Sequence, residues 1–253
     1  MTIGSLKLNL EKRVSAKELT KIEKGKSERE KQTNNKTPYL SICKDLTIIG
    51  IWVSWIGGAP AFQIFLQYGP TYLNKVLHYE VASTGFATAV PFLLALIIKV
   101  VASPFYNVVT FISEKARLVV FTIGSQGTMA VCFIVLALIP TDRAFIGWCA
   151  YAFAVGFSGL NCVGMFKCAQ MVSRQYMGFI MAVLSIINSL SVLILPPFVS
   201  YMVPTNSPEE WAMVFYIICA IVVVTNGFFC FVCKSEPASW TRDEEDDESN
   251  GSV

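Results

Sequence analysis

Six long runs without Asp, Glu or Arg divide the chain, and polar segments separate them. A bilayer crossing needs about 20 apolar residues in a helix, because the lipid core has no water to satisfy bare backbone groups. The runs therefore predict an all-α membrane protein with six transmembrane helices. We expect them near residues 46–67, 84–107, 117–140, 144–166, 177–203 and 211–233. Lys99 is the one ionisable residue well inside a span.

Polar segments at both ends complete a three-part organisation. Residues 1–45 form a basic tail or loop, 46–233 the transmembrane bundle and 234–253 an acidic tail. Within the first part, Ser15 and Glu18 have the spacing of a capping box and predict a short basic helix over 12–26, although a disordered tether fits the same composition. The run Asp243–Glu248 has the composition of a solvated tail.

The distribution of Lys and Arg predicts the orientation. Only Lys75 and Arg143 lie near the span ends on one side, while the other side carries many more. The second set is Arg29, Lys31, Lys36, Lys44, Lys115, Arg117, Lys167, Arg174, Lys234 and Arg242. Cytoplasmic loops carry the excess of positive charge, so we expect both termini in the cytoplasm. The glycosylation sequons at Asn35 and Asn250 are then expected to stay unmodified.

Composition argues against several other classes of protein. Charged residues make up 15% of the chain and hydrophobic residues 54%, and the basic residues form no nucleic-acid footprint. His78 is the single histidine, and no phosphate-binding loop of the Gly-Lys-Ser/Thr kind is present, so we expect no enzyme, cofactor or metal site. Cys230 and Cys233 have the spacing of a redox pair, but their place at the end of an apolar run favours small lipid-facing thiols.

Five stretches in order along the chain carry a family pattern: Tyr68–Tyr79, Gly85–Pro91, Gly156–Asn161, Glu209–Phe215 and Glu236–Trp240. They resemble segments of the anion and phosphate symporter family, which includes sialin and the vesicular glutamate transporters, within the major facilitator superfamily. The resemblance places the chain on the central loop and last six helices of a twelve-helix carrier. It implies the C-terminal six-helix half of such a fold.

In such carriers the substrate lies near the bilayer midplane between two six-helix halves. Uncharged polar groups and Lys99 inside the spans are therefore candidates for the substrate pathway. The candidates are Gln63, Lys99, Ser158, Asn161 and Asn188.

Each candidate also has a structural interpretation. The Lys99 ammonium either attracts an anion or snorkels about 10 Å to the membrane surface. Gln63 follows a Gly-Gly-Ala-Pro break and offers an amide either to a substrate carboxylate or to another helix. Ser158 and Asn161 lie among glycines that favour close packing, and Asn188 shares a face with Ser185 and Ser191.

The implied function is secondary transport of organic anions or phosphate. None of the six runs contains Asp or Glu, so the carboxylate that an ion-coupling site needs is not in this part of the fold. The alternative is a truncated, non-transporting membrane protein that associates with full-length carriers. The expected partners are the lipid bilayer, a small anionic solute and a second six-helix half or full-length carrier, with no nucleic acid. The membrane is that of the cell surface or of an endolysosomal or vesicular compartment.

Overall fold

The structure is a computed structural model that describes residues 37–109 and 111–241. Met1–Tyr39 forms a unit distinct from Leu40–Val253, and the second unit is described below. The basic segment 12–26, the acidic run 243–248 and the sequon at Asn250 lie outside the described residues. The predictions made for those segments remain predictions.

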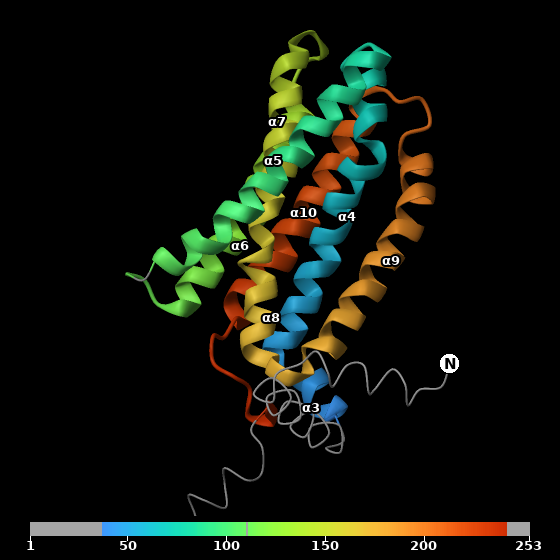
Figure 1. Ribbon diagram of the computed structural model, residues 1–253. Helices are drawn as coiled ribbons and strands as arrows, with labels where there is room; N and C mark the ends of the chain where they lie inside the picture. The colour runs from blue at the N-terminus through green and yellow to red at the C-terminus, as the bar shows by residue number, and fades with distance from the viewer. Residues whose placement is uncertain (1–36, 110, 242–253) are drawn as a thin grey trace, which may run out of the picture. The chain divides into compact units, whose positions relative to one another are not determined.

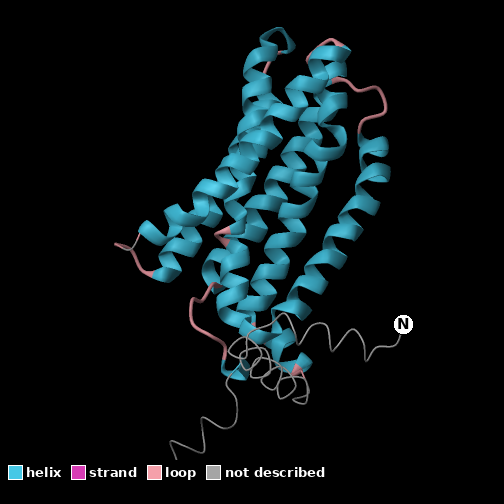
Figure 2. Cartoon of the chain, viewed as in Figure 1, coloured by secondary structure: helices cyan, strands magenta, loops and turns pink. Residues whose placement is uncertain are grey.

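The described residues form helices and no strand (Figure 2). The long helices are α4 (Leu46–Lys75), α5 (Val81–Val108), α6 (Glu114–Leu138), α9 (Met177–Met202) and α10 (Pro208–Val232). Shorter elements are α3 (Tyr39–Lys44), α7 (Ala144–Phe157) and α8 (Met165–Ser173), with 3-10 turns η1 (Thr141–Arg143), η2 (Ser158–Cys162), η3 (Arg174–Tyr176) and η4 (Ser239–Thr241).

Five helical stretches in the described part are long and apolar enough to cross a membrane, and one of them, Thr141–Met202, has 62 residues. At 1.5 Å per residue that stretch would measure about 93 Å as one helix, roughly three times the hydrocarbon core. It does not run straight. The chain reverses at Arg174, whose φ of 42° lies in the left-handed region, and α9 then runs back beside α4 (Figure 1). The stretch therefore crosses twice, which gives the six crossings that the sequence predicts.

Helix caps fix where α4 and α10 begin, and α4 also extends beyond its predicted end. Asp45 accepts hydrogen bonds from the backbone nitrogens of Thr47 (2.8 Å) and Ile48 (3.4 Å), so α4 begins at Leu46 as expected. The last helix begins at Pro208 rather than at 211, because Ser207 and Glu210 form a capping box. The first helix continues through Pro70 to Lys75 instead of ending near 67.

The fourth span differs most from its prediction. A single helix was expected over 144–166, but α7 ends at Phe157, η2 follows, and α8 continues to Ser173. Gly159 explains the close approach at this point: a Cβ there would lie 2.7 Å from the Ala95 carbonyl oxygen of α5. The wall of the bundle therefore changes from α-helix to a tighter turn in the middle of the membrane, where 3-10 segments often mark functional positions.

Two hydrophobic cores lie one above the other in the bundle. We call the end where α4 begins and α10 ends the tail-side end, and the opposite end the far end. The far-end core includes Phe65 and Phe133, whose rings stack with centroids 4.7 Å apart. The tail-side core includes Leu118, Met165 and Phe229. Polar groups occupy the level between them.

The tail-side end carries most of the charged residues that border the spans. It holds Lys115, Arg117, Lys167, Arg174 and Lys234, whereas Lys75 and Arg143 lie at the far end. The structure thus separates these charges as the sequence requires. Which compartment each end faces stays a prediction.

The segment after α10, Lys234–Thr241, folds back over the tail-side end, and we call it the C-terminal strap. Its Ala238 nitrogen donates to the Val172 carbonyl oxygen at 3.1 Å, and Trp240 Nε1 donates to Asp45 Oδ2 at 3.1 Å. The expectation that Cys233 faces lipid is wrong. Its thiol is fully buried and lies 3.6 Å from the Cys168 thiol of α8, because the strap covers it.

Candidate substrate cavity

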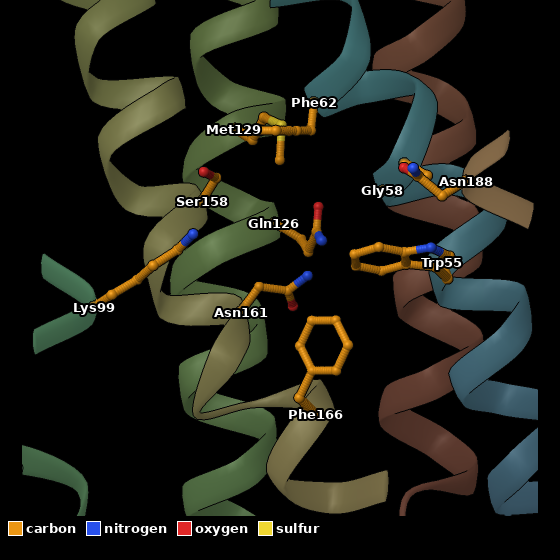
Figure 3. Close-up of a pocket in the computed structure, with 11 residues that line it drawn as sticks. Trp55, Gly58, Phe62, Lys99, Gln126, Met129, Ser158, Asn161, Phe166 and Asn188 are labelled. Atoms are coloured by element: carbon orange, nitrogen blue, oxygen red, sulfur yellow. The ribbon is translucent and has the colours of Figure 1, made fainter. Parts of the chain in front are cut away.

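A cavity of about 140 Å³ lies at the level between the two cores. Residues from α4, α5, α6, the η2 region, α8 and α9 line it (Figure 3). They are Trp55, Gly58, Ala59, Phe62, Lys99, Gln126, Met129, Ser158, Asn161, Phe166 and Asn188. Five helices and the η2 turn therefore converge on this space, whereas α7 and α10 contribute no lining residue.

Large apolar side chains bound the cavity toward each core. Phe62 and Met129 lie on the far-end side, and Trp55 and Phe166 on the tail side (Figure 3). The rings of Trp55 and Phe166 meet edge to face with centroids 5.2 Å apart. Trp55 Nε1 donates to the Leu184 carbonyl oxygen of α9 at 3.1 Å. These contacts hold the indole in one orientation, so this wall is preformed.

Two amide side chains project into the cavity with unpaired oxygens. Gln126 is 2% exposed and Asn161 is 9% exposed. Neither Gln126 Oε1 nor Asn161 Oδ1 has a hydrogen-bond partner among the described residues. Leaving a buried polar atom unpaired costs about 1–3 kcal/mol. The cavity therefore favours an occupant with hydrogen-bonding groups.

Lys99 supplies the cationic group of the cavity. Its side chain extends from α5 toward Ser158, with the ammonium at the cavity wall (Figure 3). Gly159 makes this path available, since a Cβ there would lie 3.3 Å from Lys99 Cγ. Lys99 lies nine positions before the end of α5 at Val108, which is about 13 Å along the helix axis.

Ser158 also lines the cavity, and its hydroxyl donates a hydrogen bond to the Val155 carbonyl oxygen at 2.6 Å.

Gln63 and Asn188 act as a pair. Gln63 Nε2 donates to Asn188 Oδ1 at 3.2 Å, which joins α4 to α9. Asn188 borders the cavity, whereas Gln63 is buried behind it and also accepts from Gln67 Nε2 at 3.5 Å. The two serines that share a face with Asn188 bond within their own helix: Ser185 to Met181 and Ser191 to Ile187. Gln63 thus has the geometry of an interhelical contact that positions Asn188.

The cavity brings together four of the residues selected from the sequence, namely Lys99, Ser158, Asn161 and Asn188. That they contact a substrate stays a prediction. Sequence reasoning missed Gln126 and the aromatic walls Trp55, Phe62 and Phe166. An amide in the middle of the third uncharged run was the available signal for Gln126. The aromatic residues gave no such signal, because aromatic side chains are also common in apolar spans.

A six-helix membrane bundle with a polar cavity beside a broken span has the architecture of one half of a secondary transporter. Residues 12–191 match the Major Facilitator Superfamily, and the chain belongs to this family.

Curated relatives agree with the symporter group that the sequence pattern indicates. The chain is 26% identical to human vesicular glutamate transporter 2 over 221 residues, which are 84% of this chain and 37% of the relative. It is 26% identical to human sialin over 218 residues, 82% of this chain and 42% of sialin. A putative inorganic phosphate cotransporter of Drosophila melanogaster is 23% identical over 219 residues, 83% of this chain and 41% of the relative. The chain therefore spans less than half the length of these relatives, two of which are named as transporters.

Proposed function

We propose that this chain forms the C-terminal half of a secondary carrier for small organic anions or phosphate. The observation that carries the proposal is the cavity in which the Lys99 ammonium lies with two buried, unpaired amides, Gln126 and Asn161. The names of the relatives, glutamate and phosphate transporters, support an anionic solute.

The chemistry of the cavity suits a small anion. Lys99 attracts negative charge, and the amide nitrogens of Gln126 and Asn161 are able to donate to carboxylate or phosphate oxygens. The same side chains have acceptor oxygens for hydroxyl or ammonium groups of the solute. The aromatic walls exclude water, which strengthens each of these interactions.

A second six-helix half is the partner that the proposal requires. Lys99 is exposed although it lines the cavity, so the cavity is open on the α5 side of this chain. In secondary carriers the substrate site lies between two repeats, and access alternates as one rocks against the other. The alternative, association with a full-length carrier without transport, uses the same open face.

Solute uptake into lipid vesicles tests the proposal. The chain is reconstituted alone and together with the N-terminal six helices of a relative, and uptake of labelled glutamate and inorganic phosphate is measured. We expect uptake with the second half present, and a loss of about tenfold to a hundredfold in apparent affinity for Lys99→Ala, as a charged hydrogen bond contributes about 1.5–3 kcal/mol.

Lys75→Ala is the matched control, because it removes the same charge from an exposed lysine at the far end of α4. This variant is expected to keep the wild-type affinity. Equal losses in the two lysine variants would indicate a general surface-charge effect and contradict the cavity assignment. Uptake equal to that of empty vesicles in both preparations, with solute binding to neither, would refute the carrier function and favour the non-transporting alternative.

A further inference from the structure

A second, apolar groove lies on the outside of the bundle between α4, α9 and α10. It has a volume of about 390 Å³ and is lined by Ile56, Pro60, Ile187, Leu190, Ser191, Ile194, Leu195, Phe198, Ile217, Ile218 and Ile221. Its floor is buried, with Leu195 and Ile218 each 4% exposed, whereas Ile194 on its rim is 60% exposed. The feature is therefore a groove with depth rather than a flat patch of apolar side chains.

The groove offers nothing to a polar ligand. Ser191 is its one lining side chain with a hydroxyl, and that hydroxyl donates to the Ile187 carbonyl oxygen at 2.9 Å. Water inside would find no further partner, and an empty groove would forfeit the dispersion contacts of its walls. The occupant must be apolar.

The position of the groove indicates which apolar molecule is available. All three lining helices cross the membrane, so the groove opens into hydrocarbon. On α9 it extends from Ile187 to Phe198, about 16 Å along the helix axis. Half of the hydrocarbon core is about 15 Å thick. The length of the groove thus matches one lipid leaflet.

The groove and the substrate cavity use different sides of α4. Trp55, Gly58 and Phe62 face the cavity, whereas Ile56 and Pro60 face the groove. Successive helical residues are rotated by about 100°, so the two faces diverge. A second half that covers the cavity on its open α5 side would leave the groove facing lipid, because no residue of α5 lines the groove.

We propose that this groove is a binding site for one acyl chain of a membrane phospholipid, which wedges between α9 and α10. The two helices are joined by the loop 203–207, and α9 is otherwise held on α4 by the bonds of Leu184 to Trp55 and of Asn188 to Gln63. An acyl chain completes the packing of α9 on the face that adjoins those bonds, because Ser191 and Leu195 follow Leu184 and Asn188 along the helix at a spacing of three or four residues. Since α9 also carries Asn188 into the cavity, the bound lipid sets the position of one cavity wall.

Photolabelling with a lipid tests the site without reference to transport. The full chain is placed in phosphatidylcholine bilayers in which one acyl chain carries a diazirine, irradiated, and mapped by mass spectrometry. We expect label on Leu190 and Ile194, 49% and 60% exposed, at several-fold the level found on Leu193, which is 71% exposed on the same helix outside the groove. Label that follows exposure alone would show ordinary surrounding lipid and overturn the proposal.

Two tryptophan variants provide the matched comparison. Leu190→Trp fills the groove and is expected to abolish label at Ile194, whereas Leu193→Trp adds the same side chain outside the groove and is expected to leave the label unchanged. Unchanged label in a folded Leu190→Trp protein would contradict the site, and the wild-type pattern remains decisive if this variant does not fold. A benzoyl-phenylalanine at position 194 is expected to crosslink to lipid. A crosslink to a second protein chain instead would overturn the proposal in favour of a protein interface.

Discussion

Two buried polar clusters lie beside α4, and they differ in how their amides are paired. In the first, Asn226 of α10 accepts from the Ser54 hydroxyl at 2.7 Å and donates to the Val222 carbonyl oxygen at 2.9 Å. In the second, the side-chain oxygens of Gln126 and Asn161 have no partner among the described residues. Burial is nearly equal, with Asn226 7% exposed and Asn161 9%.

Under the proposed function, this difference in pairing distinguishes amides that pack helices together from amides that bind a ligand. A paired amide between membrane helices satisfies its own hydrogen bonds and contributes on the order of 0.6–2 kcal/mol to association. An unpaired amide weakens the folded state unless something else binds it. The paired cluster therefore holds α4 to α10, and under the proposed function we expect the unpaired cluster to bind the solute.

The strongest test of this distinction removes both unpaired amides. In Gln126→Leu with Asn161→Leu, we expect anion binding to weaken by at least about a hundredfold, because two hydrogen bonds to a charged ligand contribute about 1.5–3 kcal/mol each. Thermal stability should be unchanged or higher, since these two unpaired oxygens are no longer buried. Equilibrium binding and a thermal melt of the purified protein measure both quantities. An unchanged dissociation constant would exclude the two amides from the binding site.

The paired cluster should respond in the opposite way. Asn226→Leu leaves the Ser54 hydroxyl, which is fully buried, without its acceptor. We expect a loss of about 1–3 kcal/mol in the free energy of unfolding and no change in anion affinity. Adding Ser54→Ala removes the stranded hydroxyl and should restore part of the stability. If anion affinity falls while stability holds, the assignment of this cluster to packing is wrong.

A steric test addresses the broken span beside the unpaired cluster. In Gly159→Ala the new Cβ would lie 2.7 Å from the Ala95 carbonyl oxygen and 3.3 Å from Lys99 Cγ. We expect a cost of about 1–3 kcal/mol in stability, as for other overpacked sites, together with weaker anion binding as Lys99 is displaced. Gly178→Ala is the control, because apart from its chain neighbours and the nearby backbone of its own helix nothing lies within 4 Å of its Cβ position. Equal melting temperatures in the two variants would show that α5 and η2 do not need this close approach.

The smallest expected effect concerns a paired group at the tail-side end. Trp240→Phe removes the 3.1 Å hydrogen bond to Asp45 but keeps an aromatic ring against Tyr176. We expect a loss of about 0.5–1.5 kcal/mol, measured by thermal melting, because the bond is only partly buried. Tyr216→Phe, on the exposed side of α10, should cost less. A larger loss for Tyr216→Phe would contradict a holding role for the strap.

The spans could be located from the sequence because hydrocarbon excludes charge and requires helices. The prediction was less accurate at helix ends, where caps and proline decide the boundary. The first helix was predicted to end near 67 and the last to begin near 211, whereas they end at Lys75 and begin at Pro208. The break at η2 depends on how closely Gly159 approaches α5, and such a distance between helices is not encoded in hydropathy.

Only some of the residues that line the candidate cavity could be predicted from the sequence. Lys99, Ser158, Asn161 and Asn188 were found because polar residues are rare inside spans. Gln126 met the same criterion and was overlooked. Nothing in the sequence distinguished Gln63, which bonds to another helix, from Asn188, which borders the cavity, because that difference depends on the rotation of α4 against α9.

The sequence alone determined that six helices cross a membrane, since each uncharged run must satisfy its backbone hydrogen bonds within itself. It also determined which loops carry the positive charge and, through its pattern, the family. Only the tertiary structure decided which amide oxygens find a partner among the described residues, that Cys233 lies against Cys168, and that an apolar groove separates α9 from α10. These features arise from contacts between segments far apart in the chain, and the rotation and spacing of the helices fix them.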